Sequence, residues 1–106
     1  MDILGMMKKA QALQSRLAET QDQLAAMDVE GQSGGGMVKV TMTGKYDLKS
    51  LKIDPSLLKP EEAEMVEDLI IAAFADAKGK AERLAAEKMQ EITAGLPLPP
   101  GLKLPF

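Results

Sequence analysis

The first quarter of the chain carries an unbroken seven-residue hydrophobic repeat. Apolar or small residues alternate at spacings of three and four, which predicts a helix over residues 3–27. A stripe this narrow requires a partner helix, and we expect it to pack within the domain, with an intersubunit coiled coil as the alternative. The seam consists of Ile3, Met6, Ala10, Leu13, Leu17, Thr20, Leu24 and Met27.

The middle of the chain, residues 29–54, has the period-two pattern of a small antiparallel sheet. Its glycine-rich start, 31–36, predicts a turn, and Val29–Gln32 is a candidate short strand before it. Residues 37–43 alternate as one strand and 46–54 as its hairpin partner, joined at Gly44-Lys45. Because the apolar parity changes within the second strand, we predict a β-bulge near Lys49-Ser50.

A second, longer helix is predicted over residues 60–94. Pro60 suits a first helical position, and the acids that follow suit the positive end of the helix dipole. Ala94-Gly95 is a plausible end of this helix. The Leu- and Pro-rich tail, 95–106, is expected to be extended, either docked on an apolar surface in polyproline form or loose.

These lengths have a consequence for assembly. A helix of about 35 residues is roughly 50 Å long, whereas a compact domain of this size has a gyration radius of roughly 13 Å. The helices must therefore project from the single domain expected over 1–106, and the small sheet keeps exposed edges. Both features favour an obligate homodimer with a central sheet region and protruding helical arms.

Composition removes most catalytic chemistry. The 106 residues include no His and no Cys, so the commonest bases, nucleophiles and metal ligands are missing, and structural zinc is excluded. A Ser–Lys pair is possible in principle, but no serine is singled out. We predict a protein that is not an enzyme and has no cofactor and no metal. No signal peptide or membrane span is recognisable, so we expect a cytoplasmic protein.

Two local patterns resemble ligand sites and are better explained otherwise. Gly31 and Gly36 have phosphate-loop spacing, but a strand follows them in place of a helix that begins with Lys and Ser or Thr. The five acids within residues 61–68 lack a complete calcium ligand set. We interpret them as a turn and a solvated helix start.

The formal net charge of the chain is −3. The five acids of residues 61–68 carry more negative charge than this net value. The remaining chain is slightly basic, with bases on both predicted helices and with Lys39, Lys45, Lys49 and Lys52 on the sheet. Repeated by a two-fold axis, these bases are able to form a phosphate-binding surface, although lysine at this density is also ordinary.

The whole chain resembles the YbaB/EbfC family of bacterial nucleoid-associated DNA-binding proteins. The resemblance rests on ordered blocks: Met6-Met7-Lys8-Lys9-Ala10-Gln11, Leu13-Gln14, Gly34-Gly35-Gly36-Met37-Val38-Lys39-Val40, Gly44, Lys49-Ser50-Leu51-Lys52-Ile53-Asp54-Pro55, Glu67-Asp68-Leu69-Ile70, Ala72-Ala73-Phe74, Ala77, Leu96-Pro97 and Pro100-Gly101. It implies an α+β fold of order α-β-β-β-α, a tweezer-like intertwined homodimer, and binding of double-stranded DNA with roles in nucleoid organisation and gene regulation. A link to replication or recombination proteins is also implied.

The family's DNA contacts are attributed to the helical arms. On that basis we expect phosphate contacts from Lys8, Lys9, Arg16, Lys80, Arg83 and Lys88, with the acidic helix start facing away from the duplex. The alternative is a protein-interaction adaptor that uses the arms or the tail and is linked to replication or recombination machinery. A membrane-surface helix is a more distant alternative, because the first helix has only three bases and no bulky aromatics.

Overall fold

A computed structural model describes residues 2–93 of the chain. The elements follow the order α1 (Ile3–Ala26), β1 (Asp28–Ser33), β2 (Val38–Thr43), β3 (Leu48–Ile53) and α2 (Ala63–Thr93). The three strands form one antiparallel sheet in the order β1-β2-β3, so the predicted α-β-β-β-α fold is confirmed. The expected helix end at Ala94-Gly95 and the tail 95–106 lie outside the described residues.

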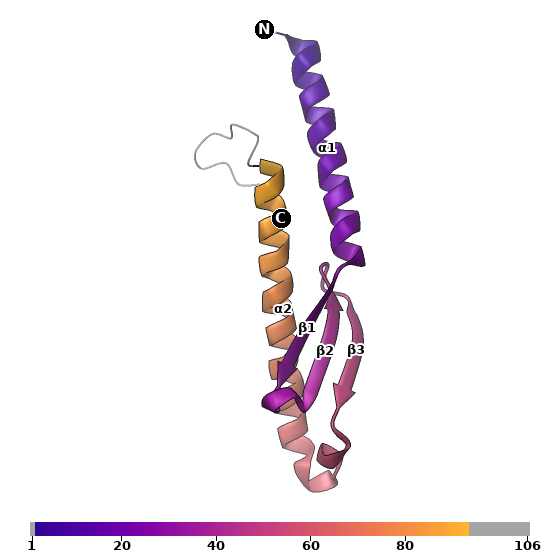
Figure 1. Cartoon of the computed structure of the whole chain (residues 1–106), viewed down its shortest axis with the longest axis vertical. Coiled ribbons are helices and arrows are strands. Elements are labelled where there is room, and N and C mark those ends of the chain that lie inside the picture. Colours follow the sequence, from indigo (N-terminus) through magenta and orange to yellow (C-terminus); the bar gives the residue numbers. More distant parts are fainter. Residues whose placement is uncertain (1, 94–106) are drawn as a thin grey trace.

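The molecule is elongated, because both helices run past the sheet. Its extents are 70 × 25 × 17 Å and its gyration radius is 19.5 Å, well above the roughly 13 Å of a compact domain of this size. α1 and the C-terminal half of α2 project as two arms from the same end of the sheet (Figure 1). The expectation that the helices outgrow their own domain is confirmed.

The core lies between α2 and one face of the sheet. Val38, Val40 and Met42 point from β2 towards three buried alanines of α2, namely Ala73, Ala77 and Ala81. The alternation predicted for β2 is therefore its burial pattern. Small residues on the helix let it approach the sheet closely, and α2 covers β1 and β2.

The third strand contains the predicted bulge. Thr41 pairs with Ser50 and Met42 with Leu48, so Lys49 is the extra residue of β3. This shift places Leu48, Leu51 and Ile53 on one face of the sheet, opposite Met42, Val40 and Val38. β3 is shorter than the predicted return strand 46–54, because Tyr46 has a positive φ of 71° in the hairpin loop and cannot continue an extended strand.

Two other expectations need correction. The residues Pro60–Glu62 form a separate 3-10 turn, and the α-helix begins at Ala63. The seam of α1 packs within the chain only at its C-terminal end, where Thr20 and Leu24 are buried, while Ile3 and Met6 remain 69% and 56% exposed. α1 is joined to the hairpin loop by the Gly44 N–H, which donates to the Leu24 carbonyl at 2.9 Å.

Only the second half of the glycine-rich segment 31–36 is a turn, because residues 31–33 belong to β1. Gly34, Gly35 and Gly36 all have positive φ angles between 60° and 93°, and the chain passes through a short 3-10 turn from β1 to β2. A strand follows this turn, so there is no helix N-terminus here to hold a phosphate.

Candidate nucleic-acid interface

The bases on α1 are the most available cations of the two arms. Lys8, Lys9 and Arg16 are exposed, and within residues 2–93 none of them has a carboxylate at ion-pair distance. They lie off the apolar seam, on the arm that projects beyond the sheet (Figure 1). This arrangement leaves three positive charges per chain free to meet an external anion.

The bases on α2 are in a different situation. Lys88 is 3.8 Å from Glu91 and its side chain is only 24% exposed, so part of its charge is neutralised within the helix. Arg83 is exposed, and its charge acts on Asp76 from two turns away along α2. The bases of α2 therefore differ from those of α1 in their local charged neighbours, although both sets were predicted as phosphate contacts.

Lys80 belongs to a contact between α2 and the edge of the sheet. Its ammonium donates to the backbone carbonyl of Glu30 at 2.8 Å and lies 3.2 Å from the carboxylate of Asp76. The same carboxylate accepts a hydrogen bond from the backbone N–H of Gln32 at 3.0 Å. Asp76 and Lys80 of α2 therefore satisfy two outward-facing backbone groups of the edge strand β1. We call this set of contacts the Asp76–Lys80 clamp.

The clamp has a structural consequence for the sheet. An edge strand with unpaired N–H and C=O groups is a template for adding another strand. The clamp occupies one N–H and one C=O of β1, so it disfavours the addition of another strand at that part of the edge. Asp76 was not among the predicted site residues, although its i,i+4 spacing to Lys80 is a signal for an ion pair on a helix.

Hydrogen bonding lowers the pKa of the Asp76 carboxyl. The main cause is the bond from the Gln32 N–H, followed by the bond from Lys80. A lowered pKa in the folded state means that the clamp stabilises the protein above about pH 4, the ordinary value for an aspartate. That contribution is lost as the pH falls through the lowered pKa.

We therefore predict a pH-dependent effect of Asp76→Asn. The variant keeps an oxygen that can accept from Gln32 but loses the charge that holds Lys80, so its melting temperature at pH 7 should be below that of the parent. Below pH 4 the difference should shrink towards zero, because the parent's carboxyl becomes protonated. Thermal melts of both proteins from pH 7 to pH 3 check this. A difference that stays constant over the range would contradict the assigned role of the charge.

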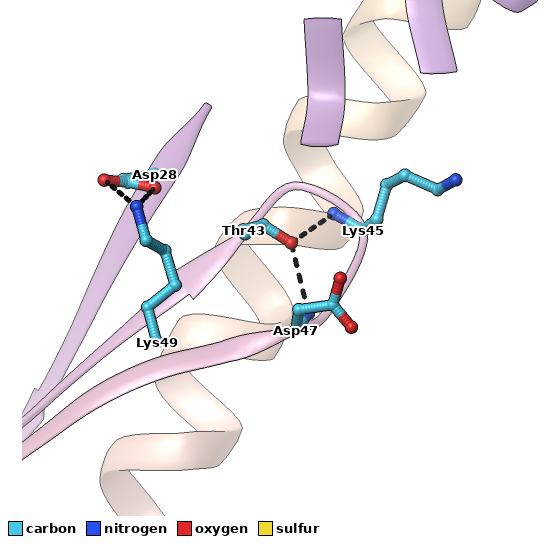
Figure 2. A network of polar contacts seen from close by, with 5 residues as sticks. All are labelled: Asp28, Thr43, Lys45, Asp47 and Lys49. Atoms are coloured by element: carbon cyan, nitrogen blue, oxygen red, sulfur yellow. Dashed lines mark hydrogen bonds and ion pairs between the residues drawn. The ribbon is translucent and has the colours of Figure 1, made fainter. Parts of the chain in front are cut away.

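The hairpin end of the sheet carries a further polar network (Figure 2). The ammonium of Lys49 is 3.0 and 3.1 Å from the two carboxylate oxygens of Asp28. The Thr43 hydroxyl accepts from the backbone N–H groups of Lys45 and Asp47, which fixes the loop. The Lys45 side chain points away from this network (Figure 2), so only Lys49 of the two is neutralised.

The described residues contain neither a metal site nor a membrane-spanning helix. Within residues 2–93 no group of three or more acidic, His or Cys side chains is able to hold a metal ion, and the acids at the start of α2 form no such set. No helix in that range is long and apolar enough to cross a membrane. The basic residues are therefore the features that suggest a ligand.

Known proteins are similar to this chain in sequence, and one solved structure is similar to it in fold. A nucleoid-associated protein of Agrobacterium fabrum is 55% identical over 105 residues, covering 99% of this chain and 98% of that protein. A nucleoid-associated protein of Brucella anthropi is 57% identical over 105 residues, which again cover 99% of this chain and 98% of that protein. The crystal structure of an uncharacterised protein from Helicobacter pylori superposes with a TM-score of 0.77 at 24% identity, covering 87% of this chain and 97% of that one, which shows a common fold.

The family comparison covers the helical arms and the sheet alike. The model of the YbaB/EbfC DNA-binding family matches residues 1–96, almost the whole chain. A family defined by DNA binding agrees with the predicted lack of enzymatic activity. With full-length relatives at more than half identity, the chain belongs to the YbaB/EbfC DNA-binding family.

Proposed function

We propose that this protein is a nucleoid-associated homodimer that binds double-stranded DNA mainly through phosphate contacts from its helical arms, and so contributes to nucleoid organisation and gene regulation. The observation that carries the proposal is the exposed, unpaired set Lys8, Lys9 and Arg16 on a projecting helix. The relatives named above are called nucleoid-associated, which supports the nucleoid as its location.

The mode of recognition follows from the side chains available. The chain has no Trp, no His and three aromatic residues in all, so base stacking has little to draw on. Lysine and arginine contact phosphates, which position a protein on the duplex without reading its sequence. We therefore expect weak sequence preference, with any preference arising from DNA shape.

The dimer is supported by an apolar surface that one chain leaves open. α2 covers β1 and β2 but not β3, so Leu48 and Leu51 remain 54% and 41% exposed on the core side of the sheet. Ile71 and Phe74 of α2 are also exposed. A two-fold axis allows two copies to cover such exposed apolar side chains mutually. We place the subunit interface there.

Duplex binding measured against salt, beside a mass measurement in solution, tests the proposal. We expect a dimer whose log affinity falls linearly with log salt, at about 0.9 per phosphate neutralised. The dimer should bind duplexes of unrelated sequence with similar affinity. A monomer, or an affinity that does not change with salt, would contradict the proposal.

A further inference from the structure

The sheet has a second face, opposite the one that packs on α2. At one end of this outer face, Gln32, Lys39 and Lys52 occupy mutually opposite positions on the three strands. All three residues are exposed. We call these positions the lysine row, because its two charged members are adjacent lysines.

The lysine row is electrostatically unfavourable on its own. Side chains directly opposite on neighbouring strands have Cβ atoms about 5 Å apart, and like charges there destabilise a sheet. Within residues 2–93 neither Lys39 nor Lys52 has an acidic side chain at ion-pair distance. By register the nearest acid on this face is Glu30, opposite Thr41 in the next row, and it pairs with neither lysine.

The contrast with Lys49 shows that the same face does neutralise a lysine elsewhere. Lys49 projects from the bulge of β3 and reaches Asp28 on β1, so its charge is compensated within the chain (Figure 2). The lysine row has no such acid and presents two uncompensated ammonium groups from a rigid, hydrogen-bonded backbone. An external anion would remove the repulsion between them.

The neighbouring side chains suit a phosphate backbone better than an acidic peptide. Thr41 and Ser50 are directly opposite each other in the adjacent row, and hydroxyl groups donate to phosphate oxygens. The outer face has no exposed apolar side chain in these rows that would anchor a peptide. The lysine ammonium binds phosphate as a point charge on a flexible side chain. This suits the DNA backbone, whose phosphates are evenly spaced whatever the base sequence.

We infer that the lysine row is a second DNA-contacting surface, outside the helical arms, in which Lys39 and Lys52 hold backbone phosphates of the duplex. This inference rests on the proposed DNA-binding function. It adds a contact from the centre of the molecule to those from the arms. Because the contact is made by lysine ammonium groups on backbone phosphates, it contributes affinity and not sequence preference.

The test uses the full chain, a duplex of arbitrary sequence and two variants. Lys39→Gln/Lys52→Gln removes both charges, and the salt slope should become shallower by about 1.8 per chain, at about 0.9 per phosphate. Lys52→Glu places opposite charges across the two strands, so it should raise the melting temperature while weakening duplex binding at least as strongly. Lys59→Gln, a single exposed lysine beside the acidic start of α2, is the control and should change neither quantity.

A failure of the lysine row and a failure of DNA binding give different results. If the parent binds duplex DNA and both folded, dimeric variants bind with the parent's affinity and slope, the lysine row is not a DNA contact and the arms carry the function alone. If the parent itself fails to bind duplex DNA at low salt, the proposed function is overturned and this inference with it. A Lys52→Glu protein that is more stable and binds more weakly is the result that supports the inference specifically.

Discussion

Replacing Gly31 with alanine will lower the free energy of unfolding by about 3 kcal/mol, the upper end of the usual cost of overpacking a core. Gly31 is buried in β1, where the strand lies directly against α2. A Cβ at this position would stand 2.3 Å from the Ala73 carbonyl oxygen and 2.4 Å from the Ala77 nitrogen. Both are backbone atoms of a helix and cannot move aside, so the added methyl group would push the strand away from α2.

The displacement would also open the Asp76–Lys80 clamp. The two backbone groups that the clamp holds belong to Glu30 and Gln32, the residues on either side of Gly31. In a protein whose total stability is about 5–15 kcal/mol, a loss of this size is large. Chemical denaturation of the two proteins measures the loss. Both are compared at equal concentration, because the stability of the proposed dimer would depend on concentration.

Gly79→Ala is the matched control, the same one-methyl change on α2. Among the described residues, no atom outside the adjacent helix backbone lies within 4 Å of a Cβ built there, and glycine inside a helix costs about 0.5–1 kcal/mol relative to alanine. This variant should be more stable than the parent by about that amount. If Gly31→Ala were as stable as the parent, the close docking of β1 on α2 would be wrong.

Removing the three bases of α1 should have the largest effect on DNA binding. In Lys8→Gln/Lys9→Gln/Arg16→Gln, six positive charges disappear from each dimer. If each neutralises one phosphate, the salt slope becomes shallower by about 5. The melting temperature should change little, because these side chains are exposed and make no described ion pair. Salt-titrated duplex binding, with thermal melts beside it, measures both effects.

Lys80→Gln is the informative comparison for that variant. Lys80 is held by Asp76 and the Glu30 carbonyl, so its loss should lower the melting temperature and alter the salt slope less than the loss of one α1 base. The reverse pattern, with α1 dispensable and Lys80 dominant, would move the interface from the free arm to the edge of the sheet.

Much of this architecture follows from the order of residues alone. The heptad spacing of α1, the alternation of β2, the glycine-rich turn and the parity change at Lys49 are local patterns, and each predicts an element or a bulge that the structure contains. The projection of the helices followed from their lengths. Local patterns succeed because helix and strand periodicities are properties of neighbouring residues.

The tertiary structure decided which charges are free and which surfaces are covered. The contacts of Asp76 and Lys80 with β1 join residues 44 and 50 positions apart, and they exist only because Gly31 lets the strand touch the helix. No periodicity could show that Lys80 is held while Lys8 is not, or that α2 leaves the core side of β3 open. The sequence by itself determined the elements and the number of bases. Packing between distant segments, which depends on backbone approach and side-chain reach, determined which of those bases remain free and which apolar side chains one chain leaves exposed.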